Sequence, residues 1–180
     1  MVIRLTLMAT SAYILSSPCS AADGLGTDWT SVRGAMFLAA NRADVPAPKN
    51  VMDCNSTGPN SCRWDAGDGV EVLATNDGAG HLAQIEASWN NAKPTSTRKS
   101  SATFRSLCAS IAGLAMPKWG KAQIAKAVTT TMIVRPSAKD SVDSEQAFPG
   151  LKIYGSRNAP EAALRDKPDE AFVQCGAVAD

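Results

Sequence analysis

Four carboxylates that lie close together among glycines are the first residues whose type and spacing point to chemistry. They are Asp65, Asp68, Glu71 and Asp77. Glycoside hydrolysis requires two carboxylates across a cleft, so Asp65 and Glu71 form a candidate catalytic pair, with Asp68 beside them. Loop carboxylates also bind calcium, but the ordered D-x-[DN]-x-[DN]-G pattern of a calcium loop is absent. Acidic residues are also favoured in turns for purely structural reasons.

Other patterns typical of catalysis are sparse. His81 is the single histidine, so a metal site built from several histidines is excluded, and its place beside Gly80 favours a residue that flanks a turn over a general base. Ser96 and Lys99 match S-x-x-K, in which a lysine activates a serine, but the S-D-N and K-T-G partners are missing. No G-x-S-x-G, Walker loop or G-x-G-x-x-G is present. We therefore assign no catalytic residue and expect no cofactor or metal.

Basic residues are concentrated in the middle of the chain. The stretch 93–139 holds nine Lys and Arg residues and no Asp or Glu, whereas both flanking segments carry an excess of acids. This order fits a mixed surface on which the segments pair their charges, or a basic face that binds an anionic partner. Cations next to a tryptophan bind anionic polymers by charge and stacking, although a solvated helix with the tryptophan in the core is the simpler alternative. The basic-face hypothesis predicts binding by Lys118, Trp119, Lys121, Lys126, Arg98 and Arg105.

Hydrophobic periodicity predicts the elements that carry these residues in the first half of the chain. Apolar residues at helical spacing indicate a helix over 29–42, with Thr27 or Asp28 as its N-cap. The segments 69–75 and 81–89 alternate apolar and polar residues on either side of a turn rich in glycine, which is typical of a β-hairpin.

The second half is predicted to contain two helices followed by two strands. An apolar stripe indicates a helix over 96–115, and 118–131 is expected to be helical as well. The polar stretch 137–147 is expected to be loop, and strands are expected over 152–154 and 171–177. The order helix, hairpin, two helices, hairpin predicts an α+β fold, with an antiparallel sheet built from hairpins and packed on one face by two or three helices.

The N-terminus has the features of a cleavable signal peptide. Arg4 gives a positive start, Leu5–Leu15 is apolar and uncharged, and small residues follow. The apolar stretch is too short to span a membrane, and no later stretch is long and apolar enough to do so. We expect residues 1–22 to be removed and 23–180 to form one globular domain in the periplasm or outside the cell. An N-terminal helix of the folded domain, or a lipid anchor at Cys19, are the alternatives.

Four cysteines remain after such cleavage, and an even number in an exported chain favours two disulfides. The residues between Cys54 and Cys62 are typical of a turn, which favours a bridge there and leaves Cys108 to pair with Cys175. The second bridge would join the helix over 96–115 to the last strand. Three connectivities exist in principle, and a zinc site, the alternative, would need a CxxC spacing that is absent.

Taken together, these features favour a small exported binding or accessory protein, for example an inhibitor or an immunity-type partner of another protein. The expected partner is another envelope or secreted protein, or an anionic polymer, and nucleic acid is not expected in that compartment. The alternative is a small secreted hydrolase that uses Asp65, Asp68 or Glu71. A carboxylate with a raised pKa beside a pocket would favour the hydrolase, and a flat basic face would favour the binding protein.

Overall fold

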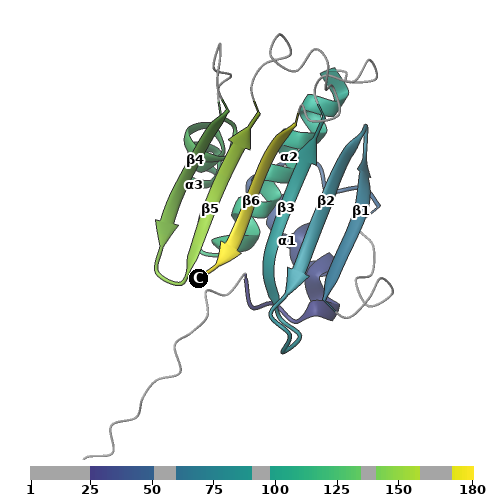
Figure 1. The fold of residues 1–180 in the computed structure, drawn as a ribbon, viewed down its shortest axis with the longest axis vertical. Coiled ribbons are helices and arrows are strands. Elements are labelled where there is room, and N and C mark those ends of the chain that lie inside the picture. The colour runs from purple at the N-terminus through teal and green to yellow at the C-terminus, as the bar shows by residue number, and fades with distance from the viewer. Residues whose placement is uncertain (1–24, 51–59, 91–97, 135–140, 159–171) are drawn as a thin grey trace, which may run out of the picture.

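The computed structural model describes residues 25–50, 60–90, 98–134, 141–158 and 172–180 (Figure 1). Several sequence predictions fall outside these ranges. They are the signal peptide over 1–22, the cysteine at position 54 and the serine of the S-x-x-K match at position 96.

Six strands form a single sheet in the described residues. They are β1 (Ser61–Gly67), β2 (Val70–Asn76), β3 (Leu82–Trp89), β4 (Val142–Phe148), β5 (Leu151–Arg157) and β6 (Val173–Ala179). Their spatial order is β1-β2-β3-β6-β5-β4, and every neighbouring pair is antiparallel (Figure 1). The order is symmetric, because two three-stranded meanders join through their last strands, β3 and β6, at the centre of the sheet.

Most of the predicted strands are confirmed. The predicted hairpin corresponds to β2 and β3, which pair with Ala74 opposite Ile85, and the two predicted C-terminal strands correspond to β5 and β6. The expectation of a loop over 137–147 is wrong from Val142 onward, where β4 begins. This strand lies at the edge of the sheet and is polar or exposed along most of its length, so no clear alternation marks it. The first strand, β1, is not among the predicted strands.

Three α-helices of the described chain lie on one face of this sheet (Figure 1). They are α1 (Val32–Ala43), α2 (Arg98–Ala115) and α3 (Lys121–Ala127). A 3₁₀ turn, η1 (Trp29–Ser31), precedes α1, and a π-helical turn, η3 (Val128–Met132), follows α3. These elements confirm the three predicted helices and the α+β class, with one antiparallel sheet packed by helices on one face.

The helix starts follow from local residues. Asp28 is the N-cap of η1, because its carboxylate accepts a hydrogen bond of 2.8 Å from the backbone N–H of Thr30. The third helix starts at Lys121 instead of position 118. Gly120 stands at its N-cap, and the Gln123 side chain accepts a 3.1 Å hydrogen bond from the Gly120 N–H.

One disulfide, between Cys108 and Cys175, is present in the described part of the chain. It joins α2 to β6, the pairing that the sequence left for these two cysteines, and the two Cα atoms are 5.8 Å apart. Both cysteines are fully buried. The expected partner of Cys62 is position 54, outside the described residues, so the second disulfide stays a prediction.

The hydrophobic core fills the space between the helices and the sheet. Ile111 of α2, Ile85 of β3 and Ile153 of β5 are all fully buried there. At one point the two layers touch through the backbone, because a Cβ added to Gly155 would lie 2.6 Å from the carbonyl carbon of Met132 in η3. None of the helices in the described ranges is long and apolar enough to cross a membrane.

Candidate functional site

The other face of the sheet is open. On most strands the side chains alternate between buried and more exposed, so every second one points away from the helices. No helix of the described chain covers this face of the sheet (Figure 1). The strand register aligns these side chains in rows that cross the sheet from β1 to β4. The central row is Arg63, Leu73, Glu86, Gly176, Tyr154 and Glu145. The row beside it is Asp65, Glu71, Ser88, Gln174, Ser156 and Asp143.

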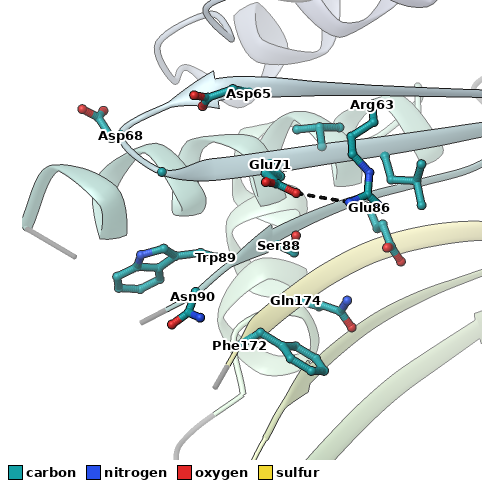
Figure 2. A pocket seen from close by; sticks show the side chains of 13 residues that line it. Arg63, Asp65, Asp68, Glu71, Glu86, Ser88, Trp89, Asn90, Phe172 and Gln174 are labelled. Carbon is teal, nitrogen blue, oxygen red and sulfur yellow. Dashed lines mark hydrogen bonds and ion pairs between the residues drawn. The ribbon is translucent and has the colours of Figure 1, made fainter. Parts of the chain in front are cut away.

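A groove with a volume of about 520 Å³ lies at one end of this open face, where the β1–β2 turn, the end of β3 and the start of β6 meet (Figure 2). We call it the acidic groove, because Asp65, Asp68, Glu71 and Glu86 line it and Arg63 is the one cation among its described lining residues. Its lining also includes neutral polar and aromatic side chains, among them Ser88, Trp89, Phe172 and Gln174.

The β1–β2 hairpin positions three of these carboxylates. Asp65 accepts a 2.7 Å hydrogen bond from the backbone N–H of Gly67. Asp68 sits in the turn with a φ of 56°, a left-handed conformation that Asp tolerates better than most residues, and accepts a 2.6 Å hydrogen bond from Thr103 of α2. Glu71 lies directly opposite Asp65 in the strand pair. Register and turn geometry therefore bring together residues that the sequence analysis singled out.

Glu71 leans along the sheet toward Arg63. The two charged groups are 3.5 Å apart, and both side chains are well exposed, at 67% for Arg63 and 58% for Glu71 (Figure 2). An exposed pair of this kind contributes little to stability. It does place one positive charge among the carboxylates of the acidic groove.

Glu86 is held differently from the other three carboxylates. The Tyr154 hydroxyl donates a 2.8 Å hydrogen bond to Glu86 Oε2, and Gln84 Nε2 donates a 3.3 Å hydrogen bond to the same oxygen. Burial, followed by the hydrogen bond to Glu86, raises the pKa of Tyr154 above its ordinary value. A phenol is protonated at neutral pH, so Tyr154 acts as a hydrogen-bond donor, and its raised pKa extends this state to more alkaline pH.

Tyr154 reaches Glu86 because the strand between them carries a glycine. Tyr154 is on β5 and Glu86 on β3, with Gly176 of β6 between them in the same row. A Cβ added to Gly176 would lie 2.5 Å from the Tyr154 hydroxyl and 2.8 Å from its Cε1. The ring therefore lies flat across β6, in space that any side chain at position 176 would occupy.

One edge of the acidic groove is aromatic. Trp89 and Phe172 line it from the end of β3 and from the residue before β6. Trp89 also packs on Phe104 of α2, with ring centroids 6.0 Å apart. Trp89 therefore links this end of the acidic groove to the hydrophobic core.

The predicted basic residues lie in the helical layer, away from the open face. Lys118 and Lys126 are exposed, and Lys121 pairs with Asp44 at the end of α1. Trp119 is half-buried and makes an edge-to-face contact with Phe148, with ring centroids 5.3 Å apart, which supports the interpretation that this tryptophan packs inward.

The remaining two predicted binding residues, Arg98 and Arg105, are exposed on α2. Arg98 begins α2 and Lys118 follows its end, so the 18-residue helix, about 27 Å long at the usual rise per residue, lies between them. The six residues therefore do not form one compact cluster.

His81 and Asp77 belong to the turn between β2 and β3. The His81 Nδ1 lies 3.1 Å from Asp77 Oδ2, and the backbone N–H groups of His81 and Ala79 donate to Asp77 Oδ1 at 3.0 and 2.8 Å. These bonds, with that from the His81 N–H the largest cause, lower the pKa of Asp77 to about 2. The interpretation of His81 as a residue that flanks a turn is confirmed.

The sequence analysis did not identify Glu86, Tyr154, Gln84 or Gly176 as parts of a site. Glu86 lies on the polar side of the predicted hairpin, a signal that was present in the sequence. In the described ranges no three His, Cys, Asp or Glu side chains are grouped as metal ligands would be. Comparisons with protein-family models, curated proteins and solved structures find no match to this chain.

Proposed function

We propose that this chain is an exported binding protein whose open sheet face binds a basic segment of another envelope or secreted protein. The observation that carries the proposal is the acidic groove, in which four carboxylates and one arginine line about 520 Å³ on a sheet face that no helix of the described chain covers. An excess of negative charge in a concave site attracts positive groups and speeds their association. An inhibitor or an immunity-type protein would use such a surface.

The arrangement fits an extended partner better than a small ligand. The carboxylates of the acidic groove come from β1, the β1–β2 turn, β2 and β3, so they are spread over several strands. Aromatic residues at one end, Trp89 and Phe172, add apolar surface of the kind that is enriched at interfaces between proteins. A segment with several cationic side chains would contact more than one carboxylate at a time.

Sequence features that favour export support the proposal. The features of residues 1–22 favour a signal peptide, and a disulfide such as Cys108–Cys175 forms and persists in oxidising compartments. N-terminal sequencing of the protein recovered from its native host would show the mature start, and the predicted pairing of Cys62 can be mapped on the same material.

A direct test measures binding of a fluorescently labelled lysine-rich peptide by anisotropy, at low and at physiological salt. Glu71→Gln and Glu86→Gln should each weaken binding by about two- to fivefold, the size expected for a partly exposed charge pair. Glu145→Gln is the matched control, because it removes the same charge from the same face at the far edge of the sheet.

The outcomes separate three possibilities. Weaker binding by the two variants of the acidic groove alone supports the proposal. An equal loss with Glu145→Gln would mean that the peptide responds only to overall charge. No binding by the wild-type protein, together with capture of an acidic polymer that Lys118→Glu and Lys126→Glu abolish, would move the function to the basic residues of the helical layer.

A small secreted hydrolase is a second candidate, favoured by one specific observation. Asp65 and Glu71 are directly opposite each other in the β1–β2 pair and both line the acidic groove. Side chains opposite each other in an antiparallel pair have Cβ atoms about 5 Å apart, so the two carboxyl groups can reach the similar separation that a retaining glycosidase requires. Turnover of chromogenic glycosides that Glu71→Gln abolishes would establish this activity, and its absence in a protein that binds the basic peptide would exclude it.

A further inference from the structure

The two oxygens of Glu86 differ in what they can still bind. Oε2 accepts hydrogen bonds from Tyr154 and from Gln84, and an ionised carboxylate oxygen has room for about two. Among the residues that the structure describes, Oε1 has no hydrogen-bond partner, and Glu86 lines the acidic groove. Within the described part of the chain, one oxygen of this carboxylate is therefore saturated and the other remains for a ligand.

This difference between the two oxygens of Glu86 discriminates between lysine and arginine, the two cationic side chains of a protein partner. Arginine binds a carboxylate most strongly through two parallel N–H bonds, one to each oxygen. A lysine ammonium is a point charge that can approach one oxygen end-on. With Oε2 of Glu86 already occupied, the two-oxygen geometry is blocked and the end-on geometry is open.

We infer that the acidic groove selects lysine over arginine, with Glu86 as the residue that binds the ammonium group and Tyr154 as the residue that positions it. The inference rests on the proposed function and specifies the chemistry of the partner. This selectivity is the reverse of the usual preference of an exposed carboxylate, which binds arginine more strongly because arginine can donate to both oxygens.

The rest of the acidic groove is consistent with end-on recognition. Asp65 uses Oδ1 for the Gly67 N–H, Asp68 uses Oδ2 for Thr103, and Glu71 directs Oε2 toward Arg63. Each of these carboxylates thus has one oxygen engaged by the protein. Glu86 is the one whose engaged oxygen carries two donors, so the discrimination should centre on it.

Tyr154 is a positioning residue whose effect can be separated from a structural role. Tyr154→Phe removes the hydroxyl but keeps the ring in the space above Gly176, so the sheet should retain its packing. It returns a lone pair to Glu86 Oε2 and permits the bidentate geometry. The readout is the ratio of two affinities, which a general loss of stability would not change.

The experiment compares two labelled peptides of equal length and charge, one with lysine and one with arginine at every basic position, on the full-length oxidised protein. The wild type should bind the lysine peptide about three- to tenfold more tightly, the range for one charge-assisted hydrogen bond that is partly exposed. Tyr154→Phe should bring the ratio close to one mainly by improving arginine binding. Glu86→Gln should weaken lysine binding. Asp143→Asn, which removes a carboxylate from the same edge strand but opposite Ser156 instead of Tyr154, should leave both affinities and their ratio unchanged.

Each negative result would contradict a different part of the reasoning. Equal affinity of the wild type for both peptides, or a preference for arginine, overturns the inference and leaves the proposed function standing. A lysine preference that survives in Tyr154→Phe overturns the role of Tyr154. If the wild type binds neither peptide, the proposed function fails, and the inference fails with it.

Discussion

Replacing Gly176 with alanine tests whether the Tyr154 ring depends on the empty position beneath it. The added methyl would lie 2.5 Å from the tyrosine hydroxyl and 2.8 Å from Cε1, so the ring must leave β6 and give up its hydrogen bond to Glu86. Overpacking of this kind costs about 1–3 kcal/mol. Alanine is itself better than glycine inside a strand by about 0.5–1 kcal/mol, which offsets part of the loss. We expect a net destabilisation of about 1 kcal/mol, because a side chain on an open face can move into solvent.

A double-mutant cycle with Tyr154→Ala isolates this effect. In that background the three atoms nearest to the added methyl are gone, so Gly176→Ala should be neutral or stabilising by about 0.5 kcal/mol. The coupling energy should therefore be about 1.5 kcal/mol, measured by urea denaturation of the oxidised protein and checked for an unchanged slope of unfolding free energy against urea. A coupling near zero would refute the reasoning, because it would mean that Tyr154 does not occupy the space above Gly176.

Two further predictions concern stability. Replacing Cys108 and Cys175 together with serine should lower the free energy of unfolding by about 4 kcal/mol, the chain-entropy value for a sequence separation of 67 residues, and calorimetry of the variant beside the wild type measures the loss. A wild-type level of stability in that variant would contradict the view that the disulfide stabilises the fold by restricting the unfolded chain. Asp77 has a pKa lowered to about 2 in the folded state, so the stability it contributes is complete above its ordinary value of 3.8 and is lost as the pH falls toward 2. Asp77→Asn should flatten the change in stability between pH 4 and pH 2, and an unchanged pH dependence would contradict this role.

The sequence was sufficient to predict the helices and strands in which the spacing of apolar residues marks the buried side. The alternation of β2 and β3 and the apolar stripe of α2 each follow from burial on one side, which is a local pattern. Cys108 lies within that stripe, which placed it against the core, and its pairing with Cys175 was predicted because the turn between Cys54 and Cys62 favoured a bridge there. The edge strand β4 carries no such pattern, because few of its side chains are buried and its place comes from hydrogen bonds to β5.

The candidate site also has parts that the sequence predicted and parts that it did not. Asp65, Asp68 and Glu71 are close in sequence, so one hairpin suffices to bring them together, and composition alone suggested them. Whether they form a pocket, and which face they occupy, follows only from the folded sheet. The same holds for the basic residues, which are continuous in the sequence but are distributed along the helical layer.

The contact of Tyr154 with Glu86 depends entirely on tertiary structure. The two residues are 68 positions apart, and they meet because β6 lies between β3 and β5 with glycine at the crossing point. A local pattern cannot encode that order, since strand pairing across the sheet is decided by the combined packing of helices and strands. The sequence thus determined, in α2, β2 and β3, which side chains face the core. The strand order decided which of the solvent-facing groups meet.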